Sequence, residues 1–197
     1  MNIIAIVQAR LGSKRLPNKV MKLINNVPMI EIILRRLSKS KVLNNIVVAT
    51  SDDSEDIKLK NFINTLGYDC EQGSRDDVLN RYICVATKYK ADLIVRITGD
   101  CPLIDPDLVD QVIQKFIKDN VDYCSNVGPA TYPDGLDVEV FTLKSLKDSY
   151  SMTTNKLDLE HVTSYLRESG KFKTSCLLNQ NDISSLRWTV DEEVDLK

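Results

Sequence analysis

A run of cationic and turn-forming residues follows the first strongly apolar segment of the chain. It consists of Gln8, Ala9, Arg10, Leu11, Gly12, Ser13, Lys14, Arg15, Leu16, Pro17, Asn18 and Lys19. The glycine lets backbone amides approach an anion closely, the arginines offer fork-shaped hydrogen bonding, and the lysines offer point charges. The segment predicts a loop that holds a polyphosphate. A structural loop with exposed cationic side chains is the alternative.

Two aspartates stand at the ends of apolar segments and offer oxygen ligands to a cation. Asp100 closes the segment 93–100, and Asp191 closes the segment 186–191. A Mg²⁺ ion that is chelated to phosphates needs only one or two protein carboxylates. Together with the cationic loop, the pair predicts a magnesium site. Each aspartate alone is also typical of a turn or a helix cap.

Several well-known sites of nucleotide, hydrolase and metal chemistry are missing from the sequence. It contains no GxGxxG dinucleotide motif, no GxxxxGK[ST] phosphate loop and no GxSxG nucleophile turn. His161 is the single histidine, which excludes metal sites built from several histidines. The five cysteines include no CxxC pair, so we expect reduced cysteines in a cytoplasmic protein.

Apolar runs and amphipathic segments alternate over the first 125 residues, and this pattern indicates how the chemistry is positioned. Strands are expected at 3–7, 46–50, 68–71, 93–97 and 121–125, and helices at 29–39, 51–66, 76–89 and 105–118. This rhythm predicts a mostly parallel sheet with helices on both faces. Ligands of such sheets lie beyond the carboxyl ends of the strands, where the loop and Asp100 would meet.

The pattern loosens after residue 125. We expect a polar loop at 128–135, an antiparallel strand at 138–142, helices at 143–151 and 158–167, and a final strand at 186–191. The chain has no internal repeat, low-complexity tract or linker, and its 197 residues suit one domain. We therefore expect a single domain over residues 1–197.

The charge distribution favours a small anionic ligand. The formal net charge is −2, but residues 1–41 carry nine Lys/Arg and one acid. A net negative charge argues against a general nucleic-acid binder, and a local basic segment favours a small anion. Chance and a solvated helix face are the alternative explanation. No apolar run approaches about 18 residues, so we expect no membrane insertion.

Six segments match motifs of one enzyme family in their family order: 8–19, 73–81, 98–105, 132–139, 160–163 and 187–191. On these segments, nearly the whole chain resembles the sugar-acid cytidylyltransferases, which include the acylneuraminate and 3-deoxy-manno-octulosonate enzymes. The resemblance is strongest to the SpsF-like branch of spore-coat polysaccharide biosynthesis. The opening loop and the Gly-Asp-x-Pro-Leu-Ile-Asp segment (99–105) are its most specific parts.

The resemblance implies both a fold and a reaction. The fold is a Rossmann-like, three-layer α/β nucleotidyltransferase fold with a mostly parallel sheet and a small dimerisation or acceptor insertion. The reaction is Mg²⁺-dependent transfer of CMP from CTP to a nonulosonic or octulosonic sugar acid, with release of pyrophosphate, for surface polysaccharide biosynthesis. A cytoplasmic homodimer is implied as well.

The resemblance also implies roles residue by residue. The residues implied to bind the nucleotide are Gln8, Ala9, Arg10, Gly12, Ser13, Arg15, Lys19, Asp76, Asp77 and Arg81. Those implied to bind Mg²⁺ are Asp100 and Asp191, and those implied to bind the acceptor are Glu139, Glu160 and His161. The catalytic residues would be Arg10, Arg15, Lys19 and Asp100. His161 could equally be a histidine on a helix surface.

The chain departs from the family pattern in three places. Gln8 stands where better-known relatives have proline, and Cys101 stands where the octulosonate enzymes usually have glutamate. Neither change removes an expected phosphate or metal contact. The chain ends six residues after Asp191, where relatives continue through another helix. We therefore expect a truncated form or a domain of a larger protein.

Two other functions stay open. A glycosyltransferase that consumes a nucleotide-sugar can use a similar sheet, but such enzymes commonly carry an Asp-x-Asp motif, and Asp100 has no acid two residues away. The second is a non-catalytic nucleotide-binding domain of a larger carbohydrate-pathway protein. No side chain by itself selects cytosine over uracil, and the acceptor sugar is not specified.

Overall fold

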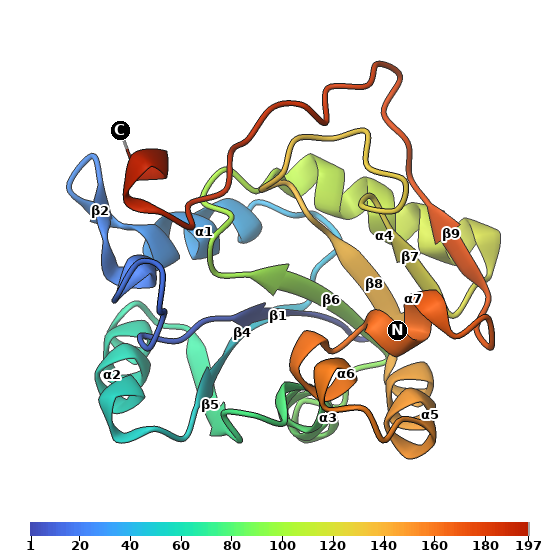
Figure 1. Ribbon diagram of the computed structural model, residues 1–197, viewed down its shortest axis with the longest axis horizontal. Helices are drawn as coiled ribbons and strands as arrows, with labels where there is room; N and C mark the ends of the chain where they lie inside the picture. The colour runs from blue at the N-terminus through green and yellow to red at the C-terminus, as the bar shows by residue number, and fades with distance from the viewer. Residues whose placement is uncertain (197) are drawn as a thin grey trace.

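A seven-stranded sheet forms the centre of the computed structural model, which describes residues 1–196 (Figure 1). Its order is β5-β4-β1-β6-β8-β7-β9. The strands are β1 (Ile3–Gln8), β4 (Asn45–Ser51), β5 (Asp69–Gly73), β6 (Leu93–Thr98), β7 (Tyr123–Ser125), β8 (Glu139–Thr142) and β9 (Thr174–Cys176). Only β8 runs antiparallel to its neighbours among these strands. The expected mostly parallel α/β sheet is confirmed.

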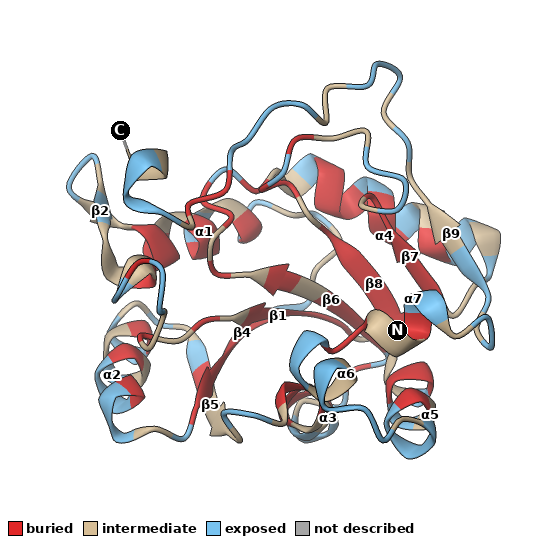
Figure 2. Ribbon diagram, in the orientation of Figure 1, coloured by how far each residue is buried: buried red, intermediate tan, exposed pale blue. Residues whose placement is uncertain are grey.

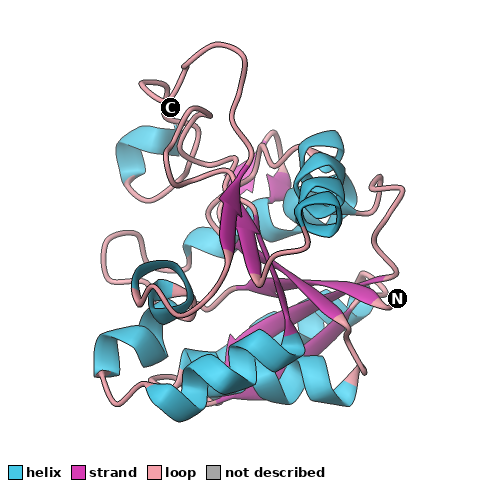
Figure 3. Cartoon of the chain, turned by 90° about the vertical axis from the view of Figure 1, so that its right-hand side faces the viewer, coloured by secondary structure: helices cyan, strands magenta, loops and turns pink. Residues whose placement is uncertain are grey.

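Helices cover both faces of this sheet, as the view along its edge shows (Figure 3). One face carries α1 (Met29–Leu37), α2 (Ile57–Thr65) and α4 (Pro106–Asp119). The other carries α3 (Val78–Lys88), α5 (Leu143–Met152), α6 (Lys156–His161) and α7 (Ser164–Glu168). Short 3-10 turns form at η1 (Lys19–Met21), η2 (Ser54–Asp56) and η3 (Glu193–Leu196).

The central strand β1 is apolar throughout because it lies between two cores. Ile3, Ala5 and Val7 pack toward one set of helices, while Ile4 and Ile6 pack toward the other. Alternate residues of a strand point to opposite faces, so a strand covered on both sides needs a continuous apolar run. Figure 2 shows this buried centre. The buried strand β1 therefore holds the start of the following loop in place.

The expected strand at 186–191 does not form, and this prediction was wrong. The segment crosses the carboxyl end of the sheet and bonds to loops: Trp188 N donates to Asp134 O at 2.7 Å, and Val190 N donates to Asp100 O at 2.8 Å. Gly135 permits this crossing, because a Cβ there would lie 2.4 Å from the nitrogen of Thr189. The last strand of the sheet is β9 instead, which the sequence pattern did not indicate.

The helix expected at 158–167 is divided into α6 and α7. Val162 lies between them with φ 64° and ψ −54°, and Thr163 N donates to His161 O at 2.6 Å. This geometry is a γ-turn, a strained conformation for a β-branched residue. It ends α6 at His161 and turns the side chain of Thr163 toward β8, where Thr163 bonds to Glu139.

A small hairpin of β2 (Leu23–Ile24) and β3 (Val27–Pro28) was also not expected. Its turn residues Asn25 and Asn26 have φ values of 49° and 63°, which suit a two-residue hairpin turn. Within residues 1–196, no helix combines the length and the apolar character needed to cross a membrane.

Candidate active site

Three connected cavities lie at the carboxyl ends of β1 and β6. The first has about 570 Å³, the middle one about 290 Å³ and the third about 570 Å³. Gln8 and Arg10 line both the first and the middle cavity. Thr98 and His161 line both the middle and the third. The shared wall residues place the three cavities side by side in this order.

The cationic loop forms one wall of the middle cavity. Leu11 N donates to the buried carboxylate of Asp56 at 2.7 Å, and Asn18 N donates to Leu11 O at 3.0 Å. These bonds fix the apolar side of the loop against the core. Its polar side then faces the middle cavity with Arg10, Ser13, Arg15 and Lys19. The expectation that these side chains gather at the strand ends is met.

Gly12 contacts the protein instead of the cavity. A Cβ at this position would lie 2.8 Å from Oε1 of Glu55 in η2. This neighbour is the end of a flexible side chain, so the contact alone does not require glycine, and the expected approach of Gly12 to a phosphate stays a prediction. Ala9 does line the middle cavity, and its backbone N–H bonds to Ala49 O at 3.2 Å.

Lys19 joins the two aspartates expected to hold a metal. Its Nζ lies 2.8 Å from Oδ2 of Asp100 and 2.6 Å from Oδ1 of Asp191. Arg15 adds a contact of 2.8 Å to the second aspartate. Burial disfavours the charged ammonium, but the two carboxylates outweigh burial and raise the pKa of Lys19. Burial likewise opposes ionisation of Asp100, and Lys19 outweighs it, so the pKa of Asp100 is lowered.

Asp191 reaches Asp100 because the chain near the C-terminal end is bonded to the turn after β6. The carbonyl of Asp100 accepts hydrogen bonds from Val190 N at 2.8 Å and from Thr189 Oγ1 at 3.1 Å. Asp195 accepts from Asp191 N at 2.8 Å and pairs with Arg187 at 3.0 Å. Loop contacts, and not the expected strand, thus hold Asp191 near Asp100.

The donor set of Asp100 and Asp191 suits Mg²⁺. Both carboxylates already contact one cation, the ammonium of Lys19, so both can reach a single ion. The described part of the chain contains no group of three or more His, Cys, Asp or Glu side chains that could hold a metal. An ion bound here would need phosphate oxygens and waters as further ligands, which is how Mg²⁺ commonly binds beside nucleotides.

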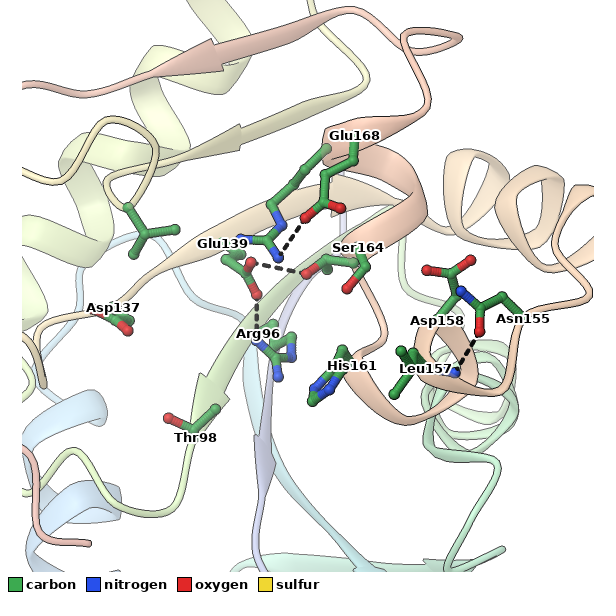
Figure 4. A pocket seen from close by; sticks show the side chains of 13 residues that line it. Arg96, Thr98, Asp137, Glu139, Asn155, Leu157, Asp158, His161, Ser164 and Glu168 are labelled. Atoms are coloured by element: carbon green, nitrogen blue, oxygen red, sulfur yellow. Dashed lines mark hydrogen bonds and ion pairs between the residues drawn. The ribbon is translucent and has the colours of Figure 1, made fainter.

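A buried ion pair organises the third cavity (Figure 4). Glu139 on β8 pairs with Arg96 on β6, and its other oxygen accepts hydrogen bonds from Tyr123 OH at 2.7 Å and Thr163 Oγ1 at 2.9 Å. Burial favours the neutral acid, but Arg96 and the two hydroxyls outweigh it and lower the pKa of Glu139. The carboxylate is thus paired within the protein, and its expected role in acceptor binding stays a prediction.

Replacing Glu139 with glutamine should lower the free energy of unfolding by about 3–5 kcal/mol, because it leaves the largely buried charge of Arg96, whose side chain is 17% exposed, without a partner. Urea denaturation measures this loss. Asp148→Asn is the matched control, since it breaks the exposed Lys144–Asp148 pair and should cost at most about 1 kcal/mol. Equal effects of the two variants would contradict a structural role for the buried pair.

The remaining expected residues divide between the cavities. Asp76, Asp77, Arg81 and Glu160 all line the first cavity. Glu160 therefore lies on the side of Gln8 and Arg10 rather than in the third cavity, where the other two acceptor candidates lie. The expected acceptor role of Glu160 stays a prediction, although the residue lines a different cavity from Glu139 and His161.

Asp77 and Arg81 also have structural contacts. Asp77 caps α3 by accepting from Asn80 N at 2.9 Å, and Tyr150 OH donates to it at 2.9 Å. Arg81 is buried, and its Nη1 donates to Ser74 O at 3.0 Å. Burial lowers the pKa of Arg81. Both residues therefore line the first cavity and also hold neighbouring segments in place.

The sequence motifs did not single out Arg96, Thr98 and Asp137, which line the third cavity. A signal for Arg96 was present, because a charged residue inside an apolar strand needs a buried partner or a site. Asp137 stands two residues before Glu139, so it shares the face of Glu139 if the strand geometry continues.

A cytidylyltransferase family model matches residues 4–195. The chain belongs to the cytidylyltransferase family. This cytidylyltransferase-family chain is 33% identical over 180 residues to the spore coat polysaccharide biosynthesis protein SpsF of Bacillus subtilis, covering 84% of this chain and 70% of that protein. It is 31% identical over 121 residues to a 3-deoxy-manno-octulosonate cytidylyltransferase of Pelobacter propionicus, covering 60% of this chain and 46% of that protein.

The fold of this cytidylyltransferase-family member has close counterparts among solved structures. A cytidylyltransferase from Leptospira borgpetersenii superposes with a TM-score of 0.95 at 33% identity, covering 99% of this chain and 83% of that one. The resemblance drawn from the six motifs is confirmed, and so is the nucleotidyltransferase fold. The family assignment favours nucleotidyl transfer over the glycosyltransferase alternative.

Proposed function

We propose that the protein transfers CMP from CTP to a nonulosonic or octulosonic sugar acid and releases pyrophosphate, as a step of surface polysaccharide biosynthesis. The observation that carries this proposal is the order of the three compartments. A cation-lined cavity lies between two larger cavities and shares wall residues with both. Asp100 lines this cavity, and Asp191 contacts its Lys19. This order suits a nucleoside, its phosphates and an acceptor in sequence. The similarity to SpsF, a spore coat polysaccharide biosynthesis protein, and to a 3-deoxy-manno-octulosonate cytidylyltransferase supports the substrate class.

The chain's own residues would divide the work as follows. Gln8, Arg10 and the first cavity hold the nucleoside and direct the triphosphate into the middle cavity. Arg15 and Lys19 stabilise the charge that builds on the β- and γ-phosphates as pyrophosphate leaves. The acceptor oxygen attacks the α-phosphorus, a new oxygen–phosphorus bond forms, and the bond to the bridging oxygen of pyrophosphate breaks. Positioning and electrostatics supply most of the rate in such reactions.

Asp100 and Asp191 would hold Mg²⁺ once nucleotide is present. The ion would neutralise phosphate charge and polarise the α-phosphate. The ammonium of Lys19 contacts the same two carboxylates. We also propose that the protein is a cytoplasmic homodimer, with residues 128–170 as the region in which to seek the interface.

Pyrophosphate release, measured with one nucleoside triphosphate at a time against a panel of sugar acids, tests the proposal. We expect release with CTP, Mg²⁺ and at least one sugar acid, and none when the acceptor is omitted. Each triphosphate should be tested in parallel for its effect on the melting temperature, because a bound ligand stabilises the folded state. Release with UTP in preference to CTP would contradict the proposed base, and release without an acceptor would contradict the proposed reaction.

A further inference from the structure

Asp137 differs from every other acidic side chain that lines the third cavity. Glu139 is paired with Arg96, Asp158 accepts a hydrogen bond from Thr153, and Glu168 pairs with Arg167. Within residues 1–196, the carboxylate of Asp137 has no hydrogen bond or ion pair with another side chain, although the residue is half-buried. A polar group removed from water without a partner costs free energy, which favours a partner supplied by a ligand.

The position of Asp137 is set by the pairing of β6 and β8. In this antiparallel pair Arg96 lies opposite Glu139, and continuing the register by two residues places Asp137 opposite Thr98. Thr98 lines both the middle and the third cavity, and Asp100 follows two residues later. Figure 4 shows Asp137 and Thr98 on the same side of the cavity. Asp137 therefore stands where the expected phosphate compartment meets the expected acceptor compartment.

We propose that Asp137 is the catalytic residue that accepts the proton of the attacking acceptor hydroxyl. This inference rests on the proposed function. The hydroxyl proton passes to the carboxylate of Asp137, and the acceptor oxygen forms a bond to the α-phosphorus. The bond between the α-phosphorus and its bridging oxygen breaks, and pyrophosphate leaves with that electron pair. The proton then passes from Asp137 to solvent before the next turnover.

The surroundings of Asp137 suit a base that works near neutral pH. Burial, together with the negative charges of Asp134, Glu139 and Asp100, raises the pKa of Asp137 to about 6, against the opposing effect of Arg96. His161, Arg167 and Glu168 line the same cavity from α6 and α7. General bases are most effective when their pKa lies near the working pH. The other acids that line the third cavity each contact a cation or a hydroxyl, whereas Asp137 does not.

The test compares Asp137→Asn with wild type, with Asp148→Asn as a control outside the three cavities. Asp148 on α5 pairs with Lys144 at the surface, so its loss should change kcat by less than about threefold. Asp137→Asn should lower kcat at least about 100-fold while the CTP-induced rise in melting temperature stays unchanged. We expect wild-type activity to fall below about pH 6, where Asp137 becomes protonated, and Asp137→Asn should lack this fall. His161 lines the same cavity, so the pH profile of His161→Gln is measured as well. We expect this variant to keep the fall in activity below about pH 6.

The outcomes distinguish this inference from the proposed function. A wild type that releases pyrophosphate beside an Asp137→Asn variant with kcat within about tenfold of it overturns the role of Asp137 alone. A rise in KM with unchanged kcat also overturns it, because the residue would then only bind the acceptor. A wild type that releases no pyrophosphate with any sugar acid overturns the proposed function, and the inference with it.

A melting experiment gives a readout that does not depend on turnover. A carboxyl whose folded-state pKa is raised costs stability above that pKa, and this cost diminishes as the pH falls through it. Asp137→Asn should therefore melt higher than wild type at about pH 8, and the difference should shrink toward about pH 4. A variant that melts lower than wild type at about pH 8 would show a structural carboxylate and overturn the proposal.

Discussion

Asp100→Asn is expected to reduce pyrophosphate release by about 10³-fold or more while the fold stays intact. The large loss follows because the site is expected to neutralise phosphate charge through a metal ion that Asp100 helps to hold. The fold should survive because the links to Val190 and Thr189 use the backbone carbonyl of Asp100, which the substitution keeps. Pyrophosphate release and thermal melting are measured on the same preparation.

The matched control for this variant is Asp105→Asn. Asp105 caps α4 by accepting from Asp107 N at 2.9 Å, and asparagine is as good a cap as aspartate. Its activity and melting temperature should stay close to those of wild type. Full activity of Asp100→Asn would contradict the metal assignment, and unfolding of that variant would show that its side chain is structural.

Lys19→Met should affect both turnover and the response to Mg²⁺. Turnover should fall by about 10³-fold, because the charge developing on pyrophosphate loses a cation. The carboxylates of Asp100 and Asp191 also lose the ammonium that lies between them, so the variant should melt lower than wild type in the absence of metal. Mg²⁺ alone, without nucleotide, should then raise its melting temperature more than it raises that of wild type, by about 2–4 °C for each kcal/mol regained.

Lys22→Met is the control for this second variant. It removes a cation three residues away. The hydrogen bonds of Lys22 to Lys19 and Met29 are made by its backbone, which the substitution keeps. It should retain turnover and show no added response to Mg²⁺. A Lys19→Met variant with wild-type turnover and a wild-type response to Mg²⁺ would contradict the position of the lysine between the two metal ligands.

The sequence pattern was most informative where a residue's surroundings follow from its own neighbours. The apolar run of β1 and the cationic loop after it predicted a buried strand with an anion site at its carboxyl end, and the structure places Arg10, Arg15 and Lys19 together there. Asp100 follows β6 in the same way. The carboxyl ends of adjacent parallel strands lie at the same edge of the sheet. The proximity of Asp100 to the cationic loop could therefore be predicted from the sequence.

Features that depend on long-range contacts could not be predicted in the same way. Asp191 was placed correctly for the wrong reason, because loop bonds to Asp100 and Asp134 carry its segment where a strand was expected. The turn at Val162 opposes the local preference of valine, which rarely adopts positive φ, so the expected helix gave no sign of it. Glu160 and His161 are consecutive residues of α6, so they face different directions and line different cavities.

The role of Asp137 illustrates a different limit. Its motif was identified, but an unpaired carboxylate is recognised only after the partners of all its neighbours are known. The sequence shows Asp137 and Glu139 as two similar acids, whereas the structure shows one free and one fully bonded. Pairing with Arg96, 43 positions away, makes that difference.

Phosphorus NMR of a complete reaction tests the central claim most directly. With CTP, Mg²⁺ and a sugar acid, we expect one equivalent of pyrophosphate for each equivalent of a new CMP–sugar phosphodiester, and no such products from Asp100→Asn. Binding of CTP without either product, across a panel of nonulosonic and octulosonic acids, would contradict nucleotidyl transfer and favour a non-catalytic nucleotide-binding domain.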